Sequence, residues 1–407
     1  MKDLQANSNK ASTMNSSDLR FIREDVKKMH AYVVQDAQGM LKLDAMENPF
    51  SLPPELGAEL GARLASVAVN RYPGPQVQLL KEALADYAGL PRGYGLVLGN
   101  GSDELISLLS LACAQSASAA NTVLAPEPGF VMYAVSAQLQ GLNYVGVPLL
   151  ADFELDEVEM LRAVDEHMPA LVYLAYPNNP SANLWSKEII SRIIERVSAY
   201  GGWVVVDEAY QPFSTHSWLD EIRSAPEAHR QVLLMRTLSK FGLAGVRIGY
   251  LMGPSAVVEE VEKIRPPYNI SVLNAECALF ALEHASVFSE QARIICEERE
   301  KMINHLSRLK GVNPFKSEGN MVLVRFDQNQ IDSHSKLAKP APGVSDPAGD
   351  NSFATKIFEG LKSRRILVKN VSKMHPLLLG CLRFTVGTPE ENSQLLSALD
   401  ELCVGHS

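Results

Sequence analysis

Short apolar runs alternate with amphipathic segments through the middle of the chain. Helical periodicity covers 79–90, 187–200 and a segment that Ser102 is expected to cap and that continues to about Ala114. The apolar runs lie within 94–101, 121–130, 170–180, 203–210, 232–240 and 247–253. Strands that are apolar throughout and separated by amphipathic helices are typical of a mainly parallel sheet covered on both faces. The pattern therefore predicts an α/β fold, with binding residues in the loops that follow the strands.

The C-terminal part of the chain has a mixed pattern. A long charged helix over 286–309 precedes short strands at 321–326, 366–371 and 382–388, with a further helix at 353–366. This predicts a smaller α+β domain. The polar segment 327–352 is rich in Pro, Gly and Ser and is expected to be a flexible surface loop. The predicted organisation is a disordered tail (1–20), an N-terminal arm with part of the small domain (21–70), a large domain (71–310) and the small C-terminal domain (311–407).

Composition and charge narrow the class of protein. The 407 residues carry 38 Lys and Arg against 47 Asp and Glu, a formal charge of −9, which disfavours nucleic acid as a partner. The most apolar stretch, 105–114, is too short to span a bilayer, so no membrane partner is expected. Five scattered cysteines without a C-x-x-C pair indicate reduced thiols and a cytoplasmic protein. No zinc-binding pattern occurs, and we expect no metal.

A lysine at the end of an apolar strand is the first candidate for chemistry. Lys240 lies in a Ser/Gly-rich turn, where its amine could form an imine with an aldehyde cofactor. Thr237, Ser239 and Arg247 surround it in sequence and would suit a phosphate monoester. Taken alone, a lysine in such a turn is more often a solvated loop residue.

Two further features favour a chemical role for Lys240 over that of a solvated loop residue. Asp207 ends the buried strand VVVD, where a carboxylate is rarely found without a cationic partner. The sequence YPNNP at 176–180 is an amide-rich turn after another strand. A lysine for an imine, an acid for a pyridinium nitrogen and a phosphate cradle are together what pyridoxal phosphate needs from a protein.

With these motifs the sequence resembles the class II aminotransferases of fold type I and, more narrowly, the histidinol-phosphate aminotransferases. Matching stretches run from about Leu43 to Pro389: LDAMENP (43–49), NRYPGPQ (70–76), GNGSDEL (99–105), YPNNP (176–180), VVVDEAY (204–210), TLSK (237–240), LAGVRIGY (243–250) and LRFTVGT (382–388). The resemblance implies the fold of the pyridoxal-phosphate-dependent transferases. It also implies a ping-pong transamination between L-histidinol phosphate and 2-oxoglutarate that yields imidazole-acetol phosphate and L-glutamate, in L-histidine biosynthesis.

The resemblance also implies a role for each matching residue. Lys240 is the imine lysine and proton shuttle, and Asp207 holds the pyridine nitrogen protonated. The remaining implied cofactor contacts are Asn179 and Tyr210 at the ring oxygen, Phe130 stacked on the ring, and Ser102, Asp103, Thr237, Ser239 and Arg247 around the phosphate. Tyr72 is implied to reach the cofactor phosphate of a neighbouring subunit, which predicts a homodimer with shared active sites.

On the substrate side, the resemblance implies that Arg383 binds the substrate carboxylate and that Tyr32 and Glu47 lie near it. Several features depart from the family pattern, among them Phe130 in place of a tyrosine, a shortened loop after Lys240, and the residues Lys369 and Ala182. Lys369 stands where some relatives use an arginine for the substrate phosphate, and a lysine offers a point charge in place of a two-pronged donor. Ala182 replaces the usual glycine after the asparagine-proline turn.

Two alternatives remain within the same cofactor chemistry: an aromatic amino-acid aminotransferase and a related decarboxylase of phosphate esters. A dinucleotide site at 99–104 is weak, because Glu104 occupies the place of the third glycine.

Overall fold

The computed structural model describes residues 19–29, 31, 35–114, 121–327 and 353–403. The chain divides into two compact units, Met1–Gln38 and Gly39–Ser407. The first contains the short helix α1 (Glu24–Lys28), which buries none of its residues. The fold and the site described below belong to the second unit. None of the helices in the described ranges is long and apolar enough to cross a membrane.

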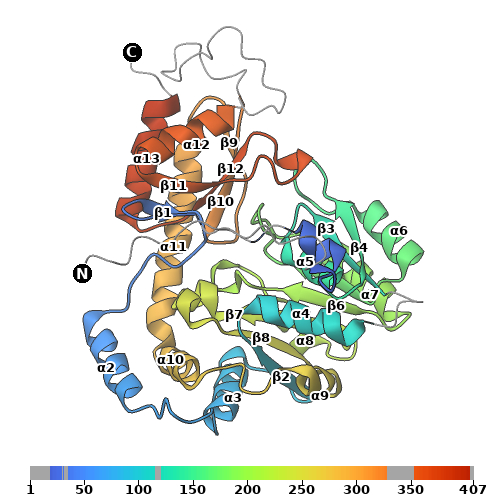
Figure 1. The fold of residues 1–407 in the computed structure, drawn as a ribbon. Helices are drawn as coiled ribbons and strands as arrows, with labels where there is room; N and C mark the ends of the chain where they lie inside the picture. The colour runs from blue at the N-terminus through green and yellow to red at the C-terminus, as the bar shows by residue number, and fades with distance from the viewer. Residues whose placement is uncertain (1–18, 30, 32–34, 115–120, 328–352, 404–407) are drawn as a thin grey trace. The chain divides into compact units, whose positions relative to one another are not determined.

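A seven-stranded sheet forms the centre of the second unit (Figure 1), in the order β2-β8-β7-β6-β5-β3-β4. Its strands are β2 (Tyr94–Gly99), β3 (Thr122–Glu127), β4 (Asn143–Pro148), β5 (Leu171–Ala175), β6 (Trp203–Asp207), β7 (Val232–Thr237) and β8 (Gly249–Pro254). The five strands from β4 to β7 in this order pair in parallel, whereas β8 runs antiparallel to both β7 and β2. The predicted α/β fold with a mainly parallel sheet is confirmed.

Helices cover both faces of this sheet, because the strands are apolar on both sides. One face packs against α4 (Ser102–Cys113), α5 (Met132–Leu139) and α9 (Ser255–Ile264). The other face packs against α3 (Gln76–Ala88), α6 (Glu157–His167), α7 (Lys187–Ser198), α8 (Trp218–Ser224) and α10 (Val272–Glu283). Helix α2 (Pro54–Ala65) lies beside α10. Buried side chains on each face form a separate hydrophobic cluster.

A second sheet has five strands in the order β1-β11-β12-β10-β9. These are β1 (Leu41–Leu43), β9 (Val312–Pro314), β10 (Met321–Phe326), β11 (Ile366–Asn370) and β12 (Cys381–Thr385). It packs against α12 (Phe353–Ser363), α13 (Pro389–Cys403) and the C-terminal part of α11 (Ala285–Leu306) around a third cluster. Figure 1 shows α11 running from the level of the large sheet to the small one. The predicted α+β pattern is present, and the domain boundaries at 70 and 310 stay predictions.

The structure corrects two local expectations. Ser102 is the first residue of α4 and not its cap, because the cap is Gly101, whose φ of 80° and ψ of 173° suit glycine. The strand expected from residue 247 begins at Gly249, since Arg247 has a left-handed φ of 57°. The expected loop at 327–352 and the expected tail at 1–20 lie almost wholly outside the described residues.

Candidate active site

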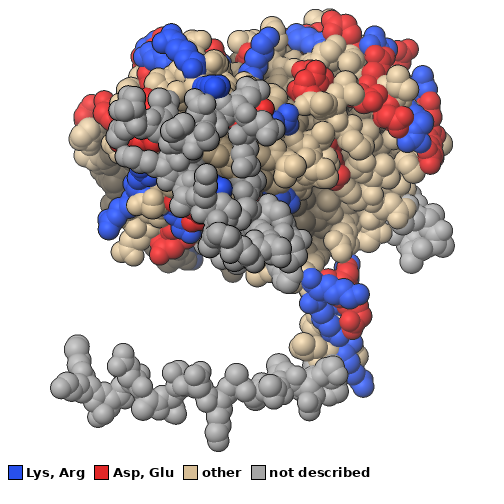
Figure 2. All heavy atoms as spheres, turned by 90° about the horizontal axis from the view of Figure 1, so that it is seen from above, with Lys and Arg blue, Asp and Glu red and all other residues tan. Residues whose placement is uncertain are grey.

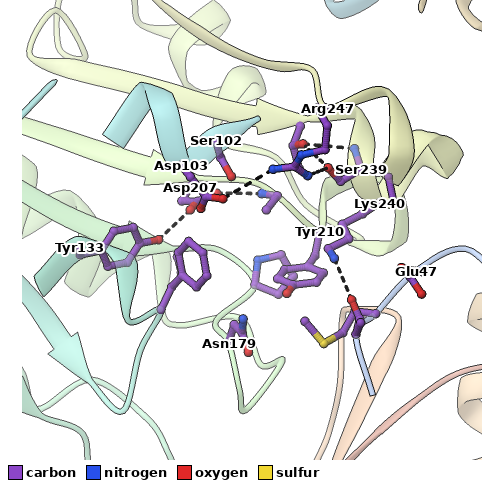
Figure 3. A pocket seen from close by; sticks show the side chains of 18 of the residues that line it. Glu47, Ser102, Asp103, Tyr133, Asn179, Asp207, Tyr210, Ser239, Lys240 and Arg247 are labelled. Atoms are coloured by element: carbon purple, nitrogen blue, oxygen red, sulfur yellow. Dashed lines mark hydrogen bonds and ion pairs between the residues drawn. The ribbon is translucent and has the colours of Figure 1, made fainter. Parts of the chain in front are cut away.

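A cavity of about 350 Å³ lies at the carboxyl ends of β5, β6 and β7, where the neighbouring β8 reverses direction (Figure 3). Binding sites of open α/β sheets are found at such ends. Lining side chains come from the large sheet and from the segment after β1: Ala45, Met46, Glu47, Ser102, Asp103, Phe130, Tyr133, Ala175, Pro177, Asn179, Asp207, Ala209, Tyr210, Thr237, Ser239, Lys240, Ala244, Gly245 and Arg247. Eleven residues predicted for the site are therefore together: Glu47, Ser102, Asp103, Phe130, Asn179, Asp207, Tyr210, Thr237, Ser239, Lys240 and Arg247.

One end of the cavity is suited to an anion. The first turn of the 12-residue helix α4 opens here, and no side chain caps it, so backbone N–H groups near Ser102 face the cavity end. Arg247 Nη1 is 3.4 Å from the Ser239 hydroxyl, and Thr237 Oγ1 is 3.0 Å from the same oxygen. A Cβ on Gly249 would come within 2.8 Å of the Ser102 nitrogen, so glycine there brings β8 against the helix start.

A buried carboxylate also lines the cavity. Asp207 is 4% exposed and accepts hydrogen bonds from the Ala209 N–H (3.0 Å) and the Tyr133 hydroxyl (2.7 Å). Burial raises its pKa to about 6, against the lowering effect of these two bonds. Within the described part of the chain, no Lys or Arg forms an ion pair with it. A cationic nitrogen bound in the cavity would supply the missing partner.

Tyr133 is a residue that the sequence analysis missed. Its ring is 2% exposed, stacks on Tyr173 at 4.3 Å and meets Phe130 edge-on at 5.6 Å. It therefore links the expected stacking aromatic to the carboxylate. The available signal was its position three residues after Phe130, which places both side chains on one side of a helical turn.

The predicted imine lysine, Lys240, also lines the cavity. Lys240 Nζ donates to the Ala45 carbonyl at 3.1 Å and lies 5.8 Å from the centre of the Tyr210 ring. Burial, then the positive charge of Arg383, lowers the pKa of this amine to about 8, whereas Glu47 opposes the shift. Part of the amine is therefore neutral near pH 8, which a nucleophilic amine requires.

Arg383 of β12, in the small sheet, contacts the cavity residue Asn179, although it is not itself among the lining residues. Arg383 is buried and donates to Asn179 Oδ1 at 2.7 Å and to the Asp44 carbonyl at 2.9 Å. Lys369 on β11 is directly opposite Arg383, so both project from the same face, although Lys369 does not line the cavity. Glu47 lines it and is paired with Lys42.

Tyr72, a further predicted site residue, does not lie at this cavity. Tyr72 is 76% exposed, stacks on Tyr268 at 4.4 Å and does not line the cavity of its own chain. Tyr32 lies outside the described residues.

The turn that contains Ala182 keeps its conformation although the family's usual glycine is replaced. This buried alanine has a left-handed φ of 62°, which favours glycine.

These features fit pyridoxal phosphate. The helix start with Ser239 and Arg247 suits its phosphate, the unpaired Asp207 suits its ring nitrogen, and Lys240 is an amine within the same cavity. On the face drawn in Figure 2, acidic and basic side chains of the described residues are interspersed.

Comparison with known proteins agrees with this chemistry. Residues 38–399 match the family of class I and II aminotransferases, and the chain belongs to that family. A histidinol-phosphate aminotransferase of Methylibium petroleiphilum is 57% identical over 93% of this chain and 94% of its own. One of Polaromonas naphthalenivorans is 55% identical over 96% and 98%.

Within the class, the chain thus belongs to the histidinol-phosphate aminotransferases, as the resemblance of its motifs implied. Among solved structures, the histidinol-phosphate aminotransferase of Sinorhizobium meliloti in complex with pyridoxal-5'-phosphate has a TM-score of 0.73. It is 25% identical and covers 89% of this chain and 90% of its own.

Proposed function

We propose that this chain is a pyridoxal-phosphate-dependent aminotransferase that interconverts L-histidinol phosphate and 2-oxoglutarate with imidazole-acetol phosphate and L-glutamate. The observation that carries the proposal is that one cavity holds Lys240, the anion site at the start of α4, and Asp207, which forms no ion pair with a Lys or Arg of the described residues. Relatives of that name at 55–57% identity favour this reaction over the aromatic aminotransferase and the decarboxylase.

We assign a separate role in the reaction to each residue of the site. Pyridoxal phosphate, when bound, supplies an aldehyde for the amino group and a ring that accepts the electrons left by the α-proton. Lys240 Nζ, with a pKa of about 8, would take the proton from the substrate Cα and return it at the carbon of the cofactor's aldehyde group. Asp207, ionised above about pH 6, holds the proton on the ring nitrogen. Asn179, Tyr210 and Phe130 line the same cavity and would orient the cofactor ring.

Substrate anions are assigned to the small sheet. Arg383 is the proposed partner of the substrate carboxylate, because its charged guanidinium is held beside the cavity by bonds to Asn179 and to the Asp44 carbonyl. Lys369, on the same face one strand away, is the proposed partner of the substrate phosphate. Glu47 and Tyr32 complete the proposed substrate side.

We also propose a homodimer with shared sites. Tyr72 and Tyr268 stack on each other at the surface, and their exposed fractions of 76% and 55% are unusually high for aromatic side chains. Exposed aromatic rings are typical anchors of protein interfaces. In the dimer, the hydroxyl of Tyr72 contacts the cofactor phosphate of the other subunit.

We also propose a cytoplasmic location. None of the five cysteines, all within the described residues, forms a disulfide, which is typical of a reducing compartment.

The deciding experiment compares amino donors with purified enzyme. Turnover is measured with 2-oxoglutarate and either histidinol phosphate or phenylalanine. The proposal expects histidinol phosphate to have the higher kcat/KM. A clear preference for phenylalanine would point to the aromatic aminotransferase, and release of CO₂ from a phosphorylated amino acid would point to the decarboxylase.

A further inference from the structure

A buried ion pair lies behind the site, on the opposite face of the large sheet. Asp207 contacts Tyr133 of α5, whereas the next residue, Glu208, contacts the start of α8. Helices α5 and α8 belong to the clusters on opposite faces. Glu208 Oε2 is 2.9 Å from both Nε and Nη2 of Arg236, which lies on the neighbouring strand β7. The two side chains are 0% and 7% exposed, and neither lines the active-site cavity.

Every polar atom of the Glu208 carboxylate is occupied. Oε1 accepts the Trp218 N–H at 2.6 Å, and Oε2 also accepts the Ser217 hydroxyl at 3.1 Å. Arg236 Nη2 is in turn 2.9 Å from the Ser217 oxygen. Burial alone lowers the pKa of Arg236, but Glu208 and Tyr250 outweigh it, so its pKa is raised and the guanidinium is charged. Replacing such a pair by uncharged side chains is often neutral for stability, so stability alone does not explain it.

The location of the pair suggests another purpose. The register of β6 and β7 ends at Asp207 and Met235, and the Glu208 N–H to Met235 carbonyl bond (2.8 Å) follows it. Beyond this bond the chains diverge, one into the turn Gln211–Phe213 and the other into the turn Ser239–Leu243. The ion pair joins them at this point, one residue after Asp207 and four before Lys240.

We propose that Glu208 and Arg236 are positioning residues that fix the separation between the Asp207 carboxylate and the Lys240 amine. This rests on the proposed function, because it assigns those two groups to one cofactor. Both Nε and Nη2 of Arg236 engage the same carboxylate oxygen, and Nη2 also reaches Ser217, so the guanidinium fixes direction as well as distance. A lysine or a neutral pair at these positions could not reproduce that geometry.

The test uses the double variant Glu208→Gln/Arg236→Met, which removes both charges and leaves no unpaired ion. We expect its unfolding midpoint to stay close to that of the wild type, while kcat with histidinol phosphate falls ~10- to 100-fold at little change in KM. The affinity of the apoprotein for pyridoxal phosphate, measured by absorbance titration without any amino donor, should also fall. The matched control is Lys187→Met/Glu221→Gln, which removes a 2.6 Å pair between α7 and α8 on the same face. It should leave all three quantities unchanged.

A double variant with wild-type kcat, KM and cofactor affinity would overturn the inference and make the pair purely structural. If that variant does not fold, Glu208→Asp keeps the charge and shortens its reach by one methylene. A folded Glu208→Asp enzyme with wild-type kcat would overturn the inference equally. Failure of the proposed function is distinguishable, because it would appear as absent turnover of histidinol phosphate by the wild type, whereas the affinity measurement needs no such substrate.

Discussion

At the scale of single residues, the site combines two buried ionisable groups, Asp207 and Lys240. The pKa of one is raised and that of the other is lowered, and both shifts favour the neutral form. Burial raises the pKa of Asp207 to about 6 and lowers that of Lys240 to about 8. Both shifts have the same physical cause, since a low-dielectric surrounding disfavours a charge. The charged form of each group is therefore poorly stabilised in the apoprotein, and a complementary group of the bound cofactor would stabilise it.

The first prediction follows from Asp207. A carboxyl group whose folded pKa lies above its unfolded value adds stability at low pH, and that contribution is lost as the pH rises through about 6. We therefore expect apo Asp207→Asn to be more stable than the apo wild type at pH 8, by ~1–3 kcal/mol. The margin should vanish as the pH falls toward 4. Urea unfolding of both apoproteins across this range measures it.

The matched control for that experiment is Asp220→Asn, at an exposed position on α8. It should show no such trend with pH. Pyridoxal phosphate should reverse the order of stability, because its ring nitrogen supplies the cation that the carboxylate lacks. An equal margin at pH 4.5 and pH 8 would contradict the argument.

The second prediction concerns Lys240. The neutral amine is the form that reacts with an aldehyde, so the rate of cofactor capture by the apoprotein should rise with pH and level off above about 8. Stopped-flow absorbance measures this rate, with a free lysine derivative as control. Glu47 favours the charged amine, so Glu47→Gln should move the midpoint to lower pH. A midpoint close to that of free lysine would show that Lys240 is not buried as described.

At the scale of elements, the anion site depends on how closely β8 approaches the start of α4. A Cβ at Gly249 would lie 2.7 Å from the Gly101 carbonyl carbon and 2.8 Å from the Ser102 nitrogen. Both are backbone atoms, which can yield only if the start of α4 moves with them. The helix start must then shift away from the phosphate. The anion site therefore depends on glycine at two positions, Gly101 before the helix and Gly249 on β8.

The third prediction is therefore that Gly249→Ala weakens cofactor affinity. Loss of one charge-assisted hydrogen bond, ~1.5–3 kcal/mol, corresponds to about 10- to 100-fold weaker binding. Titration of the apoprotein with pyridoxal phosphate measures it. The control, Gly253→Ala on the same strand, meets the movable end of the Leu233 side chain instead. It should cost some stability and leave affinity unchanged, and equal losses in both variants would sink the explanation.

The same scale shows what the sequence could and could not predict. The buried strands β5, β6 and β7 were predicted because they are continuous apolar runs. Strand β4 was missed because it is mostly half-exposed and carries no such run, and α10 because apolar residues surround it without a clear period. The reversed direction of β8 depends on long-range pairing, which a local pattern does not record.

The site shows the same division. Lys240, Asp207 and Arg247 were predicted from their places in motifs, and the structure gathers them in one cavity. Tyr133 was missed because its role comes from the packing of α5 against the end of β6. The glycine cap of α4 was mistaken for a serine cap because side-chain preference alone favours serine there, whereas the backbone conformation requires glycine.

At the scale of the whole molecule, the site joins two sheets and, in our proposal, two subunits. Arg383 of β12 is bonded to Asn179 after β5, so the small sheet is tied to the cofactor site by one guanidinium. The contact that we propose from the second subunit comes from outside this cavity. The exposed Tyr72–Tyr268 stack, which lies apart from it, is the candidate.

The fourth prediction tests whether Tyr72 acts across the subunit boundary. Its hydroxyl bond to a phosphate is charge-assisted, so Tyr72→Phe should weaken cofactor affinity by about 10- to 100-fold. Tyr72→Phe and Lys240→Ala chains are prepared separately, mixed and allowed to exchange subunits, and activity is assayed at limiting pyridoxal phosphate. If Tyr72 acts in trans, each mixed dimer has one site with both defects and one with neither, and activity rises above the average of the parents. If Tyr72 acts within its own chain, every mixed site keeps one defect and mixing gains nothing. Tyr72→Phe mixed with itself controls for the exchange procedure, and a chain that stays monomeric at assay concentrations would refute the shared site directly.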